Sequence, residues 1–371
     1  MEYIDLKAQY QSLKEEIDLN ISEVLNNAEF ILGSKVEQFE TELAKYVGVK
    51  HAITCSDGTA ALQLIYMAYG IGEGDAVFCP DMTFIASIEP ACLLGATPVF
   101  CEIDADSYNI DVNSLERQIK NVIEEGKYKP KAVVAVDFLG NPADFDAIKA
   151  VAEKYDLLVI EDAAQAMGAS YKGKKCGSFG DIAATSFFPS KPLGCYGDGG
   201  AVFTDHDEIA DIIRSLRVHG KGVDKYHNVR IGINSRLDSI QAAVLLPKLH
   251  KLEEEICIRQ KKAELYNTDI NDNIKCPNIS DGCISAYAQY VVLAKDSVER
   301  QNLQDKLKDN KVPTIRYYPV PMHKLPVFEN VNTYGESYAV SEDYAERSFG
   351  IPFSAYVSEE DQKTIVGLLN Q

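Results

Sequence analysis

Short runs of apolar, β-branched residues alternate along the first two-thirds of the chain with stretches whose apolar positions recur at helical spacing. Strands are predicted at 51–55, 75–80, 96–104, 131–138, 157–163, 183–188 and 200–205. The intervening stretches include 59–70, which ends on a glycine, and the amphipathic segment 143–155. This alternation predicts an α/β domain built on a largely parallel sheet.

The pattern changes at residues 237–266, which form one long helical stretch. The remainder of the chain combines a strand-like run at 287–294 with a charged helix at 297–309. We therefore expect an N-terminal arm with a large domain, followed by a small C-terminal α+β domain, at residues 1–250 and 251–371.

The charge balance limits the kinds of partner that the protein can have. The chain holds 37 Lys and Arg residues against 56 Asp and Glu residues, a formal net charge of −19. Nucleic acids and anionic membrane surfaces are repelled by such a protein, so we expect neither as a partner. An anionic substrate would need basic residues placed locally against this background field.

Cysteine usage and hydropathy indicate a soluble cytoplasmic protein. Nine cysteines are scattered without a C-x-x-C pair, which fits reduced thiols better than a disulfide framework. The first residues are charged and show no signal-peptide core. No apolar run approaches the ~18 residues needed to span a bilayer.

Three familiar motifs fail on their context. The stretch 168–175 nearly matches a phosphate-binding P-loop, but Lys175 stands where a Ser or Thr must bind magnesium, and no clear helix follows. The glycines of 70–75 precede a strand rather than a helix, which argues against a dinucleotide site. The six histidines lack H-x-x-x-H spacing, so we predict no metal site.

One lysine, Lys191, lies in an unusual setting, the glycine-rich segment SFFPSKPLGCYGDGGA at 186–201. The apolar run upstream of it ends on Glu161 and Asp162, and α/β sheets build ligand sites at the carboxyl ends of such strands. A carboxylate and an amine are therefore candidates for one site.

A phosphate cradle is expected at Gly58 and Thr59, because free amides and the helix dipole at a helix start suit a phosphate. Pyridoxal phosphate requires these parts: an amine for its aldehyde, a carboxylate for its protonated pyridine nitrogen and a phosphate cradle. Asp162 would stay ionised beside that nitrogen because the opposite charge offsets desolvation. Spacing alone leaves a second interpretation open, in which Lys191 is a solvated loop residue.

Over nearly its whole length, the chain resembles the sugar aminotransferases of the DegT/DnrJ/EryC1/StrS family. The resemblance rests on SDGTAAL, DMTFIAS, VIEDAAQAMGASYKGKKCGSFGD, TSFFPSKPLGCYGDGGA, RVHG, GINSRLDSIQAAVL and RYYPVPMHKLPVF. It implies the PLP-dependent transferase fold type I, like that of aspartate aminotransferase. This fold has a mostly parallel mixed sheet flanked by helices, a smaller C-terminal α+β domain, and pyridoxal 5'-phosphate bound by the large domain.

The resemblance implies a role for each matching residue. Lys191 would be the Schiff-base lysine and Asp162 the pyridine partner, and these two would be catalytic. The other contacts to the cofactor would be a hydrogen bond to its ring hydroxyl from Gln165, stacking by Phe84, and phosphate contacts from Gly58, Thr59 and Ser186.

Partners are implied as well. Asn234 would reach the phosphate of the neighbouring subunit's cofactor, which implies a homodimer with shared active sites. Glutamate would donate the amino group and a nucleotide-linked keto sugar would accept it, with Lys191 moving the proton between substrate carbon and cofactor carbon. A family dehydratase would carry histidine in place of Lys191. A non-enzymatic sensor or regulator on the same fold is an alternative, although a DNA-binding version would need a basic patch that the chain lacks.

The substrate expected from the resemblance is an acidic sugar. Segments 185–201, 234–249 and 287–290 are most similar to the branch that makes a 3-amino sugar from a UDP-linked 2-acetamido-3-keto-hexuronic acid for surface polysaccharide. Arg236 would bind the sugar carboxylate from the neighbouring subunit, because a planar guanidinium pairs bidentately with a carboxylate. Pairing of Arg236 with Asp238 or another interface acid is the alternative.

Further sugar or nucleotide contacts are predicted at Tyr317, Tyr318 and His323. At Tyr317 the chain departs from that branch, which has a histidine there. A 4-keto-6-deoxy nucleotide sugar is therefore the alternative substrate.

Overall fold

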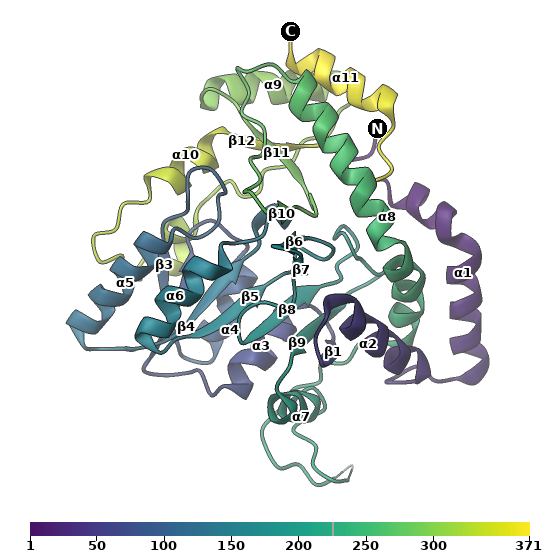
Figure 1. Cartoon of the computed structure of the whole chain (residues 1–371), viewed down its shortest axis with the longest axis vertical. Helices are drawn as coiled ribbons and strands as arrows, with labels where there is room; N and C mark the ends of the chain where they lie inside the picture. The colour runs from purple at the N-terminus through teal and green to yellow at the C-terminus, as the bar shows by residue number, and fades with distance from the viewer. Residues whose placement is uncertain (225) are drawn as a thin grey trace.

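A mixed seven-stranded sheet forms the centre of the larger part of the molecule (Figure 1). The computed structural model describes residues 1–224 and 226–371. In spatial order the strands are β1 (His51–Cys55), β9 (Gly200–Thr204), β8 (Ile182–Ser186), β5 (Leu158–Asp162), β4 (Lys129–Val136), β2 (Asp75–Pro80) and β3 (Thr97–Cys101). Strand β9 is antiparallel to both of its neighbours, and the other neighbouring pairs are parallel. All the expected strands are present, with ends that shift by a few residues.

The central strands are buried on both faces, which explains why they read as apolar runs rather than alternating patterns. In β5, for example, Ile160 packs into the core on one face and Val159 into the core on the other. The helices that cover the first face are α3 (Gly58–Ala68), α4 (Glu89–Leu93) and α7 (Asp207–Leu216). Those that cover the opposite face are α2 (Ser34–Val47), α5 (Val112–Glu125), α6 (Phe145–Tyr155) and the first half of α8 (Ser239–Asp269).

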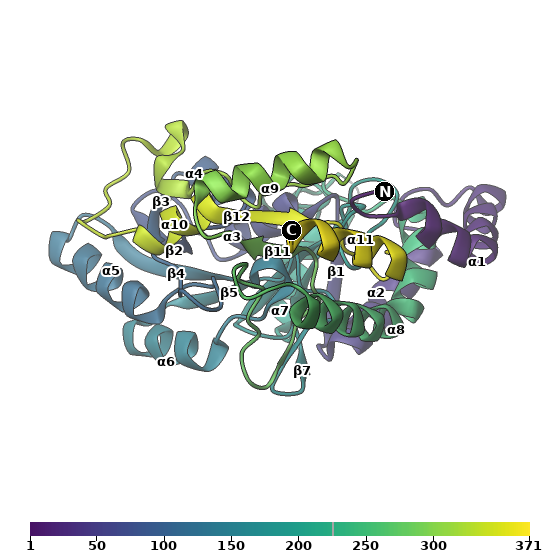
Figure 2. The same cartoon turned by 90° about the horizontal axis from the view of Figure 1, so that it is seen from above.

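The small C-terminal part, whose helices and strands lie together in Figure 2, has a hydrophobic core of its own. Its strands β11 (Tyr290–Leu293) and β12 (Ser348–Ile351) pair antiparallel. Helices α9 (Ser297–Asp309) and α11 (Glu359–Leu369) and the end of α8 pack around them. The strand expected near 287–294 and the helix expected at 297–309 are both confirmed.

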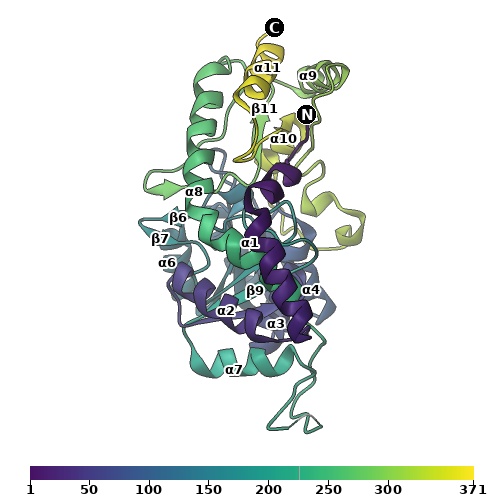
Figure 3. The ribbon, with the colours of Figure 1, turned by 90° about the vertical axis from the view of Figure 1, so that its right-hand side faces the viewer.

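Helix α8 belongs to both cores because it is 31 residues long. Its first turns bury Ala242 among the residues under the large sheet, and its last turns bury Tyr266 in the small core. Residue 250, where the sequence predicts a domain boundary, falls inside this helix, as does Pro247. Helix α1 (Leu6–Asn27) lies along α8, with Ile17 packed near Val244 (Figure 3).

Short elements complete the chain. A small sheet contains β10 (Cys283–Ile284), β6 (Ser170–Tyr171) and β7 (Lys174–Lys175), so 168–175 forms a hairpin rather than a P-loop. The others are α10 (Ala339–Arg347) and the 3-10 turns η1 (Ile85–Ser87), η2 (Phe138–Gly140), η3 (Met322–Lys324) and η4 (Pro326–Phe328). Among the helices of the described residues, none is both long and apolar enough to cross a bilayer.

The residues that bear on function lie at one edge of the sheet, where the parallel strands have their carboxyl ends. The parallel strands β2, β4, β5 and β8 all end there, and the register pairs Val136 with Asp162 and Asp162 with Ala184. At the same edge, β9 begins at Gly200, directly against the start of α3. A methyl group on Gly200 would lie 2.4 Å from the Asp57 carbonyl oxygen and 2.8 Å from the Gly58 amide nitrogen.

We therefore expect Gly200→Ala to lower the free energy of unfolding by about 1–3 kcal/mol, because the start of α3 must shift to admit the methyl group. The measurement is urea unfolding followed by circular dichroism. Gly367→Ala is the matched control: Gly367 lies inside α11 with open space around its Cβ position. This control should be neutral or stabilising. Equal stability of the two variants would contradict the prediction.

Candidate active site

A cavity of about 480 Å³ opens at this edge of the sheet. It is bounded by the ends of β4, β5 and β8, the start of α3, and a segment of the small C-terminal part. Nine of the predicted site residues line it: Gly58, Thr59, Phe84, Asp162, Gln165, Ser186, Lys191, Tyr317 and Tyr318. The topology thus gathers residues from positions 58 to 318 around one space.

The start of α3 provides one end of the cavity. The Asp57 side chain caps the helix by accepting a hydrogen bond from the Ala60 amide at 2.8 Å. Among the described residues, neither the Gly58 amide nor the Thr59 amide has a hydrogen-bond acceptor within the chain. A Cβ at Gly58 would lie 2.7 Å from Cβ of Ser186, so glycine permits the helix start to approach Ser186. Free amides beside a hydroxyl at a helix N-terminus suit a phosphate.

Asp162 lines the same cavity from the end of β5 and is 5% exposed. One carboxylate oxygen accepts a hydrogen bond from the Ser87 hydroxyl at 2.7 Å, and the other accepts one from the Ala164 amide at 3.1 Å. Burial raises the pKa of Asp162, while these two donors and the nearby Lys191 oppose the rise. A cationic ligand group at this point would be strongly stabilised.

Lys191 faces the same cavity from the turn that follows β8. Its backbone amide donates to the Phe188 carbonyl at 2.9 Å, which fixes the turn. Desolvation lowers the pKa of Lys191 to about 8, although Asp162 opposes this shift. A lysine with a lowered pKa keeps more of its amine in the neutral, nucleophilic form near neutral pH.

Aromatic rings border the space between these groups. The Phe84 and Tyr318 ring centroids are 5.8 Å apart, and Phe84 is 55% exposed, so part of its ring is open to a ligand. Gln165 donates through Nε2 to the Tyr318 hydroxyl at 3.3 Å and accepts from the Leu139 amide at 2.7 Å. A flat aromatic ligand fits beside such rings.

The whole set fits pyridoxal phosphate. Free amides at the start of α3 suit its phosphate, Asp162 suits its pyridinium, Phe84 suits its ring face and Lys191 suits its aldehyde. The roles of the individual residues stay predictions.

Two other predicted residues do not line the cavity in this single chain. Asn234 is exposed and pairs in a bridge with Val218. Arg236 is half-buried and has no ion pair or hydrogen bond to any residue that the structure describes, Asp238 included. Both side chains are therefore available to another molecule.

His323 also lies away from the cavity and is engaged elsewhere. Its Nδ1 lies 2.7 Å from a carboxylate oxygen of the buried Asp81, its Nε2 lies 3.2 Å from Glu342, and its ring stacks on Tyr338. Burial alone would lower the pKa of His323, but the bonds to Asp81 and Glu342 raise it. This network ties the segment after Tyr318 to the end of β2. A sugar contact by His323 stays a prediction.

Several residues of the cavity were not singled out from the sequence. Ser87 ends the motif DMTFIAS and lies 75 residues from its partner Asp162, so only the fold brings the two together. Gln289 belongs to the YAQY segment. Three more lie in the segment 186–201 around Lys191: Phe188, Ser190 and Asp198.

The chain is similar to known proteins over nearly its whole length. Residues 11–370 match the sequence pattern of the DegT/DnrJ/EryC1/StrS aminotransferase family. The UDP-2-acetamido-2-deoxy-3-oxo-D-glucuronate aminotransferase of Pseudomonas aeruginosa is 44% identical over 370 residues, covering 100% of this chain and 99% of that protein. A pleiotropic regulatory protein of Geobacillus stearothermophilus is 38% identical over 367 residues, covering 98% of this chain and 96% of that protein.

A solved structure shows the same architecture. The crystal structure of a DegT DnrJ EryC1 StrS aminotransferase from Brucella abortus superposes with a TM-score of 0.97 at 45% identity, covering 100% of this chain and 98% of that chain. The predicted PLP-dependent transferase fold is therefore confirmed.

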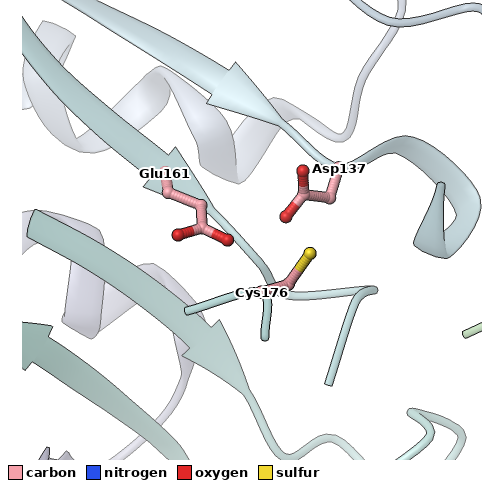
Figure 4. A group of neighbouring side chains, drawn as sticks. All are labelled: Asp137, Glu161 and Cys176. Atoms are coloured by element: carbon pink, nitrogen blue, oxygen red, sulfur yellow. The ribbon is translucent and has the colours of Figure 1, made fainter. Parts of the chain in front are cut away.

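A second buried group lies beside β5, formed by Asp137, Glu161 and Cys176 (Figure 4). Glu161 accepts hydrogen bonds from the Gly177 and Phe179 amides at 2.6 and 2.7 Å. One carboxyl oxygen of Asp137 has no hydrogen-bond partner among the described residues, and Glu161 and Cys176 are the side chains beside it. Burial, reinforced by Glu161, raises the pKa of Asp137 well above its usual range, and burial raises the pKa of Glu161 to about 7, which favours the protonated form of Asp137.

This protonated state predicts a pH-dependent difference between wild type and Asp137→Asn. The pKa of Asp137 is raised on folding, so its contribution to stability is complete at low pH and is lost as pH rises through the folded value. An asparagine keeps a donor at every pH. The measurement is urea unfolding of both proteins at pH 5 and pH 9. We expect the free energy of unfolding of Asp137→Asn, relative to that of wild type, to be about 1–3 kcal/mol higher at pH 9 than at pH 5.

The exposed Asp281 provides the control, and Asp281→Asn should run parallel to wild type over the same pH range. Parallel curves for Asp137→Asn and wild type would show that Asp137 is not the proton carrier.

Proposed function

The chain belongs to the DegT/DnrJ/EryC1/StrS aminotransferase family, and on that premise we propose that it aminates carbon 3 of UDP-2-acetamido-2-deoxy-3-keto-hexuronic acid. It is a pyridoxal-phosphate-dependent aminotransferase that acts on a nucleotide-linked keto sugar. The observation that carries the finer proposal is the 44% identity, over the whole chain, to a relative named for the UDP-linked 3-oxo-glucuronate. Glutamate is the proposed amino donor.

Each cavity residue has a proposed part in this reaction. When bound, pyridoxal phosphate supplies an aldehyde and an electron-accepting ring. Lys191 would hold the cofactor through its Nζ at the aldehyde carbon, and its amine would serve as the base that moves the proton between the substrate carbon and the cofactor carbon. Asp162, oriented by Ser87, keeps the pyridine nitrogen protonated. Phe84 and Gln165 hold the ring, while Gly58, Thr59 and Ser186 hold the phosphate.

Charge supports a site that is shared between two copies of the chain. Three carboxylates line the cavity, those of Asp57, Asp162 and Asp198, and Lys191 is the one cation among its described lining residues. The substrate adds a diphosphate and a sugar carboxylate, so further cations must be brought in. We propose that Arg236 and Asn234 of a second subunit enter the site, Arg236 at the carboxylate and Asn234 at the cofactor phosphate.

The setting of the reaction belongs to the same proposal. Nine free cysteines fit a reducing cytoplasm, and a 3-amino uronic acid on UDP is a precursor suited to surface polysaccharide such as O-antigen. The second candidate function is a regulator on the same fold, which the name of the Geobacillus stearothermophilus relative favours. Absorbance decides between the two, because glutamate would bleach an enzyme-bound yellow band by giving its amino group to the cofactor, which a regulator would not need to do.

We expect Lys191→Ala to lose transamination completely while keeping its fold. The substitution removes a covalent partner from a cavity and leaves the core intact, so the unfolding midpoint should change little. Amino transfer from glutamate to the keto sugar is measured by product chromatography. Turnover above trace level in this variant would overturn the assignment of Lys191.

Arg236→Ala tests the substrate. Wild type should prefer the UDP-linked 3-keto uronate over the same sugar without the C6 carboxylate by roughly 100-fold in kcat/KM, because an unpaired buried charge is costly. The variant should lose this preference and keep activity on the neutral sugar. A wild type indifferent to the carboxylate, or one that prefers a 4-keto-6-deoxy sugar, would refute the uronate while leaving the aminotransferase activity intact.

A further inference from the structure

The turn that carries Lys191 is folded tightly upon itself. The Cys195 amide donates to the Phe187 carbonyl at 2.8 Å, which closes the turn across Lys191. A Cβ at Gly194 would lie 2.6 Å from the Pro189 carbonyl oxygen, so the two sides of the turn are in close contact. The carbonyl of Gly194 therefore has a fixed place, three residues after Lys191.

A buried lysine on α8 holds that carbonyl. Lys248 is 3% exposed, and its Nζ donates to the Gly194 carbonyl oxygen at 2.6 Å. The same ammonium lies 4.1 Å from the centroid of the Tyr196 ring, a cation–π contact. Removing an ammonium from water is costly, so a lysine this deeply buried with a single hydrogen bond needs a compensating role.

A second residue of α8 holds the next part of the turn. Gln241 accepts a hydrogen bond from the Tyr196 amide at 2.9 Å, and a Cβ at Gly197 would lie 2.8 Å from the Gln241 side-chain nitrogen. Lys248 is seven residues further along α8, about two helical turns, and so lies on the same side of the helix. Together the two side chains hold residues 194–197 against α8 by hydrogen bonds.

The charge of Lys248 is supported by a carboxylate about two turns further along the same side of α8. Glu255, also buried, accepts a hydrogen bond from the Tyr356 hydroxyl at 2.7 Å and lies near Lys248. Burial lowers the pKa of Lys248 to about 8 and Glu255 opposes this, so the ammonium is largely protonated at pH 7. The Lys248 ammonium can therefore donate its hydrogen bond to the Gly194 carbonyl oxygen at this pH.

We propose that Lys248, assisted by Gln241, is a positioning residue that sets the placement of Lys191 for its reaction with the aldehyde of pyridoxal phosphate. Neither α8 side chain lines the cavity, so they act through the turn and not on the ligand. The phosphate cradle lies on other elements, the start of α3 and the end of β8. This inference rests on the proposed role of Lys191.

The test is the rate at which the cofactor-free full chain forms the yellow covalent adduct with pyridoxal phosphate, in which the amine adds to the aldehyde and water leaves. Lys248→Met removes the donor at similar volume, and we expect adduct formation to slow by about tenfold, since small misplacements of a reacting group are costly. Affinity for pyridoxamine phosphate, which lacks the aldehyde, should be unchanged by calorimetry, because the cradle is intact.

Lys251→Met is the matched control, on the same helix with a partly exposed side chain paired to Glu254, and should react like wild type. Should Lys248→Met fail to fold by circular dichroism, Gln241→Leu takes its place and should slow the adduct at least threefold. An adduct rate within twofold of wild type in the folded variant, or equal weakening for both cofactor forms, would overturn the positioning role. A wild type that forms no adduct would instead overturn the proposed role of Lys191.

Discussion

The site depends on two opposite charges kept close together inside the protein. Burial penalises both: it raises the pKa of Asp162 and lowers that of Lys191, and each group reduces the shift of the other. Such a pair is stable only where hydrogen-bond donors satisfy the carboxylate oxygens and a rigid backbone holds the amine in place. Ser87 and Ala164 provide the first, and the turn after β8 provides the second. The fold must therefore deliver both groups to one edge of the sheet.

Parallel strands meet that requirement because their carboxyl ends lie together. Asp162 ends β5, and Lys191 follows the neighbouring strand β8 after five residues. The antiparallel β9 then brings Gly200 against the start of α3, which places the free amides of Gly58 and Thr59 beside Ser186. Burial raises the pKa of both Asp137 and Glu161, which favours a protonated carboxyl and so reduces the negative charge buried near Asp162.

The sequence predicted the strands well because a sheet covered on both faces leaves continuous apolar runs. It also indicated Lys191, Asp162, Gly58 and Thr59, whose roles depend on local features such as a strand end or a helix start. The contacts of Ser87 and Lys248 could not be predicted, because their partners lie 75 and 54 residues away and only the topology pairs them. His323 follows Tyr318 closely in the chain, yet the buried Asp81 draws its ring out of the cavity.

Helix α8 has a practical consequence for protein engineering. Families of this kind invite the construction of chimaeras, in which the C-terminal part of one enzyme is grafted onto the body of another to transfer sugar preference. A crossover at residue 250 would cut α8 between Lys248 and Tyr266. Lys248 donates a hydrogen bond to the turn that carries Lys191, and Tyr266 packs in the small core. Junctions placed before Asp238 or after Ile270 would keep the helix whole. If the helix is exchanged together with the turn that carries Lys191, the contacts between the two are kept in the hybrid.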